Sequence, residues 1–307
     1  MTVTPAGLPA RSGPALVAAA WMVGTLLSFA TMAIAVREVS PAIHTFEIMF
    51  FRTGIGFIVL LPIVAWHGFA PLRTGRLRLH AVRNFIHFFG QLGWFYGVTL
   101  LPLATVFALE FTTPIWAALL AVLFLGERMT RGRTVAILFG FMGILIVVQP
   151  GFAEIGTGTF VLLGAAICFA STIAFTKMLT RSESALTVLF YMTLIQAPFS
   201  TMLMFGEWTA PTGVQFGWLC AIGLTGLSAH YCTTRALAIA DATVIVPIDF
   251  LRLPLIAVAA ALLYDEPVRA AVLVGALLIF SGNYYNLRRE YRTIPAAERT
   301  AASRLDA

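Results

Sequence analysis

Long apolar runs, one after another along the whole chain, are the sequence feature that most restricts its fold. The hydrocarbon core of a bilayer, about 30 Å thick, takes around 20 apolar residues of helix to cross. Ten runs meet this requirement, and the connections between them are short. They are Pro14 to Val36, Ala42 to Trp66, Leu79 to Leu100, Pro102 to Leu125, Gly132 to Val148, Thr159 to Thr180, Leu186 to Phe205, Gly213 to Ile239, Asp241 to Tyr264 and Val268 to Asn286. The sequence therefore predicts an all-α integral membrane protein with ten transmembrane helices, successive helices being antiparallel.

The composition excludes a soluble protein. Only 11% of the residues are charged and 59% are hydrophobic, whereas a soluble domain carries about 25% charged residues. The basic residues lie mainly between the apolar runs, which favours a role in membrane orientation and not in nucleic-acid binding. Cys168, Cys220 and Cys232 lie inside apolar runs without metal-ligand spacing. We therefore expect no metal site, no disulfide and no cofactor.

The distribution of arginine predicts the orientation. With a cytoplasmic N-terminus, the outside connections contain only Arg37 and Arg269. The inside connections and the C-terminal tail contain Arg73, Arg76, Arg78, Arg128, Arg131, Arg133, Arg181, Arg288, Arg289, Arg292, Arg299 and Arg304. Because basic residues collect on the cytoplasmic side, we expect both termini there, in a bacterial-type inner membrane. Residues 288–307 are expected to form a polar cytoplasmic tail.

The second half of the chain repeats features of the first half at an offset of 139 residues. Glu110 falls on Asp249, and Gln91 falls on His230. Each copy contains five apolar runs, an odd number, so the second copy must enter the membrane from the opposite side. We therefore expect two inverted repeats, residues 14–148 and 159–287. Such repeats place a binding site near the midplane and support alternating access, although a purely structural duplication would leave the same pattern.

The two repeat-related acids are the leading site candidates. Glu110 and Asp249 each lie eight residues into their runs, which is about 12 Å deep at the rise of an α-helix. Charged groups at that depth are costly and usually face a partner or an aqueous cavity. Either acid would contact an ammonium group of a substrate or carry a coupling proton; alternatively, the acids pair to hold helices together. Arg252 is three residues after Asp249, so an ion pair between them is expected.

Polar residues in the third run recur at helical spacing. Asn84, His87 and Gln91 form one stripe, which Trp94 extends. Such a stripe would line a cavity or form hydrogen bonds between helices. His230, the repeat partner of Gln91, is expected on the opposite wall. His80, at the start of the stripe, is expected at the membrane surface.

Other charged and aromatic residues complete the candidate set. Glu47 and Arg52 are five residues apart, about 140° around a helix, so they cannot pair and are expected to have structural roles. Glu127 and Glu266 end corresponding runs, where we expect them to stabilise turns or gates. Aromatic residues such as Phe111, if they face inward, would suit a substrate with a planar or cationic part.

Several motifs resemble one known family. They are Leu101-Pro102-Leu103-Ala104 through Pro114 to Leu125-Gly126-Glu127-Arg128, the second copy Ala240-Asp241-Ala242 through Pro254 to Tyr264-Asp265-Glu266-Pro267, and Phe51-Arg52. With them, the chain from Pro14 to Leu287 resembles the EamA-type branch of the drug/metabolite transporter superfamily. The resemblance implies a central cavity lined by the first, third and fourth helices of each repeat. Asp265 stands where the first copy has Gly126, which puts the geometry of that turn in doubt.

The repeat and the resemblance together predict a function. We expect a secondary transporter that moves an amino acid or amino-acid-derived small metabolite, with export favoured. The alternative is uptake of a vitamin or cofactor such as riboflavin or S-adenosylmethionine. The chain contains no H-E-x-x-H, G-x-S-x-G or G-x-x-x-x-G-K-[ST] motif, so we expect neither an enzyme nor ATP coupling within the chain. Its expected partners are a small-molecule substrate and the lipid bilayer, and the sequence leaves a homodimer open.

Overall fold

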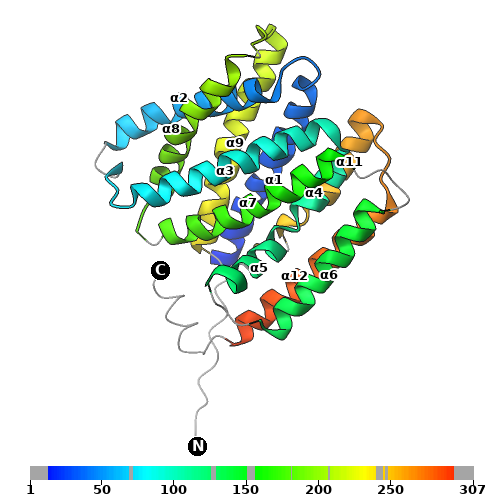
Figure 1. The fold of residues 1–307 in the computed structure, drawn as a ribbon. Coiled ribbons are helices and arrows are strands. Elements are labelled where there is room, and N and C mark those ends of the chain that lie inside the picture. Colours follow the sequence, from blue (N-terminus) through cyan, green and yellow to red (C-terminus); the bar gives the residue numbers. More distant parts are fainter. Residues whose placement is uncertain are drawn as a thin grey trace, which may run out of the picture.

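A computed structural model of the chain describes residues 13–68, 72–125, 129–150, 156–180, 182–206, 208–239, 245 and 248–293. Its labelled elements are all helices, and they form one bundle (Figure 1). The helices are α1 (Gly13–Val39), α2 (Thr45–His67), α3 (Leu77–Leu100), α4 (Leu103–Glu110), α5 (Thr113–Leu125), α6 (Arg131–Val148), α7 (Thr157–Leu179), α8 (Ala185–Met204), α9 (Gly213–Ile239), α11 (Arg252–Tyr264) and α12 (Ala270–Thr293).

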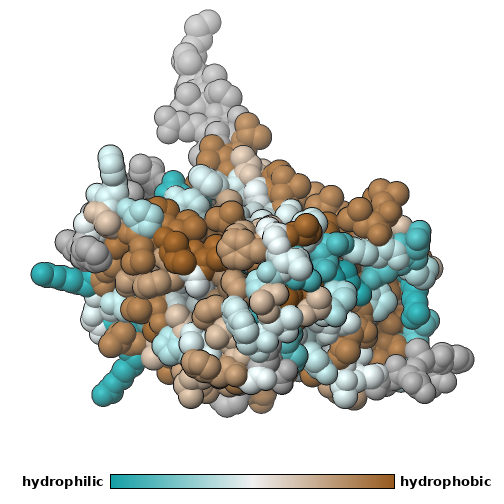
Figure 2. Space-filling model, turned by 90° about the horizontal axis from the view of Figure 1, so that it is seen from above, coloured by the Kyte–Doolittle hydropathy of each residue, from teal (hydrophilic) through white to brown (hydrophobic). Residues whose placement is uncertain are grey.

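The outer surface of the bundle is apolar. Leu16, Val214 and Leu262 are each at least 72% exposed, and Figure 2 shows hydrophobic residues over broad areas of one face. Within the described residues, seven helices are long and apolar enough to cross a membrane. The polar α3 and the 13-residue α11 are not among these seven. The chain is therefore a multi-pass membrane protein, and the number of ten crossing helices stays a prediction.

The two halves of the chain interlock. The main contacts pair α1 with α9, α3 with α7, α6 with α12, α2 with α8, and α4 with α11. Each of these pairs joins a helix before residue 150 to a helix after residue 156. The largest apolar core accordingly contains buried residues from both halves, such as Phe95 and Ile256. Neither half would bury its apolar face without the other.

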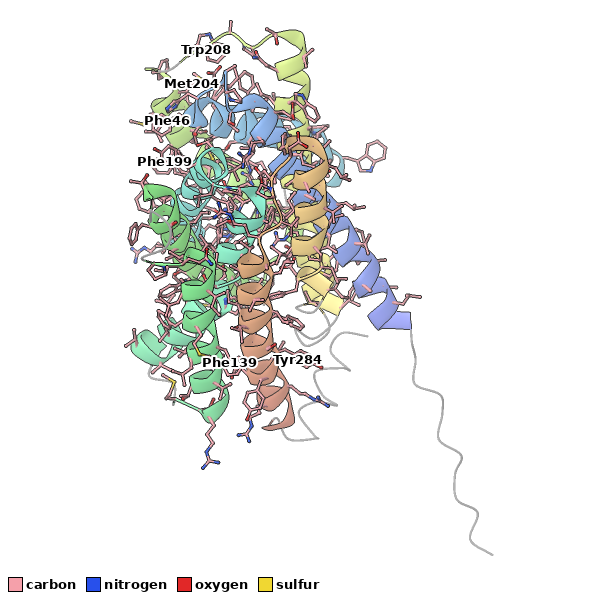
Figure 3. The ribbon with its side chains drawn as sticks, turned by 90° about the vertical axis from the view of Figure 1, so that its right-hand side faces the viewer. Phe46, Phe139, Phe199, Met204, Trp208 and Tyr284 are labelled. Atoms are coloured by element: carbon pink, nitrogen blue, oxygen red, sulfur yellow. The ribbon has the colours of Figure 1, made fainter. Side chains whose placement is uncertain are left out.

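Glycine permits a close contact between α6 and α12. A Cβ atom on Gly143 of α6 would lie 2.6 Å from the Gly275 carbonyl oxygen, and one on Gly275 would lie 2.6 Å from the Gly143 oxygen. The two backbones therefore touch, as small residues permit in membrane helix pairs. Figure 3 shows Phe139 of α6 and Tyr284 of α12 near the same end of this pair.

The run expected as a single helix from Pro102 to Leu125 is interrupted. Helix α4 ends at Glu110 and α5 begins at Thr113. Proline has no backbone N–H, so Pro114 cannot donate to the Glu110 carbonyl, and the Thr113 hydroxyl donates to it instead at 2.6 Å. A turn at residues 250–251 precedes α11 in the same way. Pro114 and Pro254, at corresponding positions of the two halves, follow directly after the two breaks.

The turn after α11 keeps its geometry without glycine. Asp265 ends the helix in the left-handed conformation with φ 53° and ψ 25°, and its N–H donates to the Ala260 carbonyl. Aspartate is among the few non-glycine residues that adopt this conformation. The doubt raised by the missing glycine is thereby resolved.

Some expectations concern residues at the limits of the described chain. Helix α12 continues to Thr293, so Arg288 and Arg289 extend the last helix where a tail was expected. Glu127, Arg128, Arg181 and residues 294–307 lie outside the described residues.

Candidate functional site

Two acids from the two halves of the chain bind one arginine. Arg252 Nη2 donates to Glu110 Oε1 at 3.0 Å and to Asp249 Oδ2 at 3.2 Å. The ion pair expected between Asp249 and Arg252 is therefore present, and Glu110 joins it. The side chain of Arg252 is only 4% exposed, whereas those of Glu110 and Asp249 are 15% and 30% exposed. The acids are thus the more accessible members of this group.

The breaks in the helices create this arrangement. Glu110 is the last residue of α4, Arg252 is the first of α11, and Asp249 lies just before the turn that precedes α11. The helix interruptions therefore coincide with the charges. Discontinuous membrane helices of this kind form ion and substrate sites in transporters, because their ends leave backbone groups free for a ligand.

Three aromatic rings surround the same guanidinium. The Arg252 Cζ atom lies 4.7 Å from the centre of the Phe29 ring, 5.0 Å from Phe107 and 5.2 Å from Phe111. Ring faces attract cations at these distances. We call Phe29, Phe107, Glu110, Phe111, Asp249 and Arg252 the Arg252 cluster. Its two carboxylates and three rings form a site suited to an organic cation, and the guanidinium occupies it in this structure.

Trp94 connects the Arg252 cluster to α3. Its indole Nε1 donates to Glu110 Oε2 at 2.7 Å. Both oxygens of Glu110 therefore have partners, one from each half of the chain. Phe111 also stacks on Phe250, with ring centres 4.2 Å apart. These contacts fix the orientation of Glu110 and Phe111 within the cluster.

The polar stripe on α3 faces protein and not lipid. Asn84, His87 and Gln91 are each at most 5% exposed. Asn84 Nδ2 donates to the Tyr191 carbonyl at 3.1 Å, and Gln91 Nε2 lies 3.1 Å from His87 Nδ1. The stripe thus forms hydrogen bonds between helices, one of the two expected alternatives, and its lining of a cavity stays a prediction.

His230 links the stripe to the Arg252 cluster. Its ring centre lies 5.0 Å from that of His87 and 5.9 Å from that of Phe29. Phe29 in turn contacts Arg252. The candidate residues in the two halves are therefore joined by one chain of contacts across the interior.

The structure separates Glu47 from Arg52, as the helical spacing predicts. Glu47 Oε2 accepts a hydrogen bond from the Thr209 backbone at 3.1 Å. Arg52 donates from Nη1 to Gln91 Oε1 at 3.0 Å. Arg52 thus belongs to the polar interior with Gln91, while Glu47 fixes the connection before α9.

His80 lies in the first turn of α3, at one end of the bundle, so its position at the membrane surface stays a prediction. Its side chain is fully buried by protein, and Nε2 lies 2.6 Å from Glu183 Oε2. Thr74 also donates to Glu183. These contacts join the α2–α3 connection to the α7–α8 connection, so His80 lies inside a junction that only the folded chain forms.

Sequence reasoning missed two residues of the interior. Phe29 was not distinguished from the many other phenylalanines. Arg83 was overlooked, although it lies four residues before His87 on the same stripe and is 4% exposed. A search for every charged residue inside the apolar runs would have found Arg83, because charge at that depth is uncommon.

Glu266 connects the turn after α11 to the end of α1 and the start of α4. Its Oε2 accepts from the Leu103 N–H at 2.8 Å, and its Oε1 lies 3.2 Å from Arg37 Nη2. Arg37 also donates to the Leu101 carbonyl at 2.5 Å. We call Arg37, Leu101, Leu103 and Glu266 the Glu266 clasp. The role expected for Glu266 at a turn or gate agrees with this geometry.

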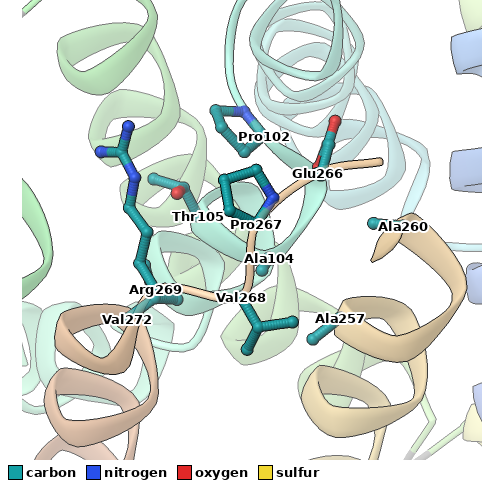
Figure 4. Close-up of a pocket in the computed structure, with 10 residues that line it drawn as sticks. All are labelled: Pro102, Ala104, Thr105, Ala257, Ala260, Glu266, Pro267, Val268, Arg269 and Val272. Atoms are coloured by element: carbon teal, nitrogen blue, oxygen red, sulfur yellow. The ribbon is translucent and has the colours of Figure 1, made fainter. Parts of the chain in front are cut away.

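A small recess opens beside the Glu266 clasp, as Figure 4 shows. Its lining residues are Pro102, Ala104, Thr105, Ala257, Ala260, Glu266, Pro267, Val268, Arg269 and Val272. The recess contains no residue of the Arg252 cluster. In the part of the chain that the structure describes, the residues of that cluster are packed together, with the acids partly exposed. Among the described residues, no three His, Cys, Asp or Glu side chains are placed to hold a metal ion.

Comparison with known proteins places the chain among transporters. The model of the EamA-like transporter family matches residues 16–149 and again residues 156–288. An S-adenosylmethionine uptake transporter of Rickettsia felis is 29% identical, covering 89% of this chain and 93% of the relative. A riboflavin transporter of Rhizobium johnstonii is 30% identical, covering 91% and 93%. A pseudopaline exporter of Pseudomonas aeruginosa is 26% identical, covering 82% and 89%.

The fold also occurs in a solved structure. A crystal structure with a TM-score of 0.65 covers 93% of this chain and 100% of the other chain at 17% identity. At that identity the likeness concerns the fold alone.

Proposed function

The chain belongs to the EamA-like transporter family, and we propose that it takes up a small organic cation with a planar part, such as S-adenosylmethionine. It is a membrane transporter and not an enzyme, because its family and its relatives are transporters. The substrate and the direction of transport are the proposed part. Uptake is favoured here because the S-adenosylmethionine transporters match at the greater similarity, whereas the exporter match is weaker. This replaces the export expected from the sequence.

The proposal rests on the way in which the Arg252 cluster binds a cationic group. Two carboxylates and three rings surround the Arg252 guanidinium. The sulfonium or ammonium group of S-adenosylmethionine has the same charge and the same affinity for carboxylates and ring faces. Such a group would exchange with the guanidinium, and the adenine ring would stack beside Phe111 and Phe250.

Inverted repeats would explain the interlocked packing. The helix pairs α1 with α9 and α7 with α3 would be equivalent, and the pairs α6 with α12, α2 with α8 and α4 with α11 would lie on the symmetry axis. The two matches of the family model, on either side of residue 150, support repeats at 14–148 and 159–287. A site on the axis is where rocking of the repeats gives alternating access.

Contacts between connections support the proposed orientation. The Glu266 clasp joins three connections that the arginine distribution assigns to the outside. The contacts of Glu183 join two that it assigns to the cytoplasm. With both termini in the cytoplasm of an inner membrane, these contacts would hold the connections together at both ends of the bundle.

The acids would also carry a coupling proton. Glu110 and Asp249 share one cationic partner and remain partly exposed. Two neighbouring carboxylates that share one cation repel each other, so one of them is our candidate to carry a proton with the substrate.

Counterflow in proteoliposomes tests the function. Vesicles loaded with unlabelled S-adenosylmethionine should accumulate labelled S-adenosylmethionine from outside, because only a carrier shows exchange of this kind. Riboflavin, named in the second group of relatives, is the matched comparison, since it has a planar ring but no fixed positive charge. Exchange of riboflavin without exchange of S-adenosylmethionine would reject the cation proposal, and no exchange of either would reject both substrates.

A further inference from the structure

Two buried arginines in the interior lack a negative partner. Arg52 of α2 and Arg83 of α3 are 5% and 4% exposed. Their hydrogen bonds go to neutral groups, from Arg52 to Gln91 and from Arg83 to Asn84 and Thr176. No carboxylate of the described residues lies within ion-pair distance of either guanidinium. In this they differ from Arg252, which has two.

One network of hydrogen bonds joins Arg52 to Arg83. Arg52 donates to Gln91, and Gln91 Nε2 lies 3.1 Å from His87 Nδ1. Gln196 Nε2 contacts His87 and the Asn84 carbonyl, and the Asn84 side chain accepts from Arg83. The Nε atom of Arg52 is buried and has no hydrogen-bond partner within the described chain. Gly226 allows this approach, because a Cβ atom there would lie 3.0 Å from that Nε.

A buried cation without a counter-charge is costly. The penalty for removing a guanidinium from water is several kcal/mol even after relaxation, and a partner normally offsets it. Here the two positive charges increase the penalty for each other. Both guanidiniums are donors only and carry positive charge, so a partner that offsets them is an anion.

We propose that Arg52 and Arg83, together with the neighbouring His87 and His230, form a binding site for a small oxyanion, the carboxylate of the transported substrate. The identity of that carboxylate rests on the proposed function, whereas the anion site itself does not. The contacts from His230 through Phe29 to Arg252 join this site to the Arg252 cluster. One zwitterionic molecule therefore places its cation at the acids and its carboxylate at the arginines.

Acetate tests the anion site without reference to any substrate. The purified full-length chain is melted while sodium acetate replaces sodium HEPES at constant ionic strength. A ligand that binds only the folded form stabilises it, so Tm should rise by about 2 °C or more and then saturate. Arg52→Gln and Arg83→Gln should abolish the rise, whereas Arg235→Gln, an exposed arginine over Trp21, should retain it.

Lysine variants keep the test decisive if the glutamine variants fail to fold. Arg52→Lys and Arg83→Lys keep the charge, so they should keep part of the acetate response even if the glutamine variants unfold. A wild-type Tm that does not respond to acetate would overturn the anion site. A response that is unchanged in folded glutamine variants would overturn it equally.

A second measurement identifies the source of the anion. S-adenosylmethionine and its decarboxylated analogue differ at the carboxylate, so the wild type should bind the analogue at least about tenfold more weakly. Arg52→Gln should weaken binding of S-adenosylmethionine but not of the analogue. Equal affinities, with uptake of both dependent on added acetate, would assign the site to a free anion. Failure of both compounds to bind would reject the proposed substrate and leave the acetate result standing.

Discussion

At the scale of single residues, Glu110 is held by partners on both of its carboxylate oxygens. It receives the Trp94 indole on one oxygen and the Arg252 guanidinium on the other. Asp249, its counterpart in the second half, binds the same guanidinium through Oδ2 and is twice as exposed. These two residues occupy corresponding positions in the sequence but have different environments. Glu110 is the more firmly held, and Asp249 is the more accessible.

Replacing Glu110 should abolish transport while the protein still folds. Glu110→Gln removes the negative charge and turns an amide N–H group toward Arg252 or Trp94, so we expect uptake to fall at least about tenfold. Trp94→Phe removes only one hydrogen bond and should have a smaller effect. Initial uptake rates in proteoliposomes measure both, with Ser281→Ala, which loses only a bond to its own helix, as the control. Wild-type uptake by Glu110→Gln would contradict the site.

Asp265 offers a stability prediction at a single backbone position. Its φ of 53° is in the left-handed region that favours glycine. Asp265→Gly should therefore raise the free energy of unfolding by about 1 kcal/mol, and the β-branched Asp265→Val should lower it by more. Thermal melting of the purified variants measures the difference, and Asp265→Asn should match the wild type. A glycine variant that melts below the wild type would show that the Asp265 side chain stabilises the turn.

At the scale of helices, interruptions and close contacts decide the architecture. Proline at position 114 explains why α4 stops near Glu110, since the helix loses a donor there and the Thr113 hydroxyl replaces it. Glycine explains the close contact between α6 and α12, where the two backbones meet with no side chain between them. The first feature exposes polar groups in the interior, and the second joins the first half of the bundle to the second half.

The α6–α12 contact should not tolerate a side chain at Gly275. Gly275→Val places a Cβ atom 2.6 Å from the Gly143 carbonyl oxygen, so the helices must separate at a cost of about 1–3 kcal/mol. We expect a lower melting temperature and lost transport. Gly54→Ala is the matched control, because a Cβ atom on Gly54 meets nothing within 4 Å. Equal melting temperatures for the two variants would contradict the packing described here.

At the scale of the whole molecule, the two halves meet at three levels. The Glu266 clasp joins them at one end, the Arg252 cluster in the interior and the contacts of Glu183 at the other end. A transporter must open one end while the other stays closed. The contacts at the ends are therefore where a change of state would be controlled, and the interior contacts are where the substrate would act.

Weakening the Glu266 clasp should loosen one end selectively. Glu266→Gln loses the ion pair with Arg37 and weakens the bond to the Leu103 N–H. We expect faster hydrogen–deuterium exchange in peptides covering residues 100–105 and 264–270, and unchanged exchange around Glu183. Arg269→Gln changes a neighbouring exposed charge that lines the recess and should leave both regions unchanged. Equal exchange in Glu266→Gln and the wild type would show that the clasp does not hold this end closed.

The sequence determined the class of protein and the approximate limits of most of its helices, and it predicted that Glu110 and Asp249 lie well inside apolar runs. These follow from composition, run length and spacing, which act along one helix and need no knowledge of its neighbours. The tertiary structure decided that both acids share Arg252, that Phe29 and Phe107 face this cation, and that His80 is buried against Glu183. The physical reason is that helical periodicity gives the angle of a side chain around its own axis. Which group it meets depends on how distant helices pack.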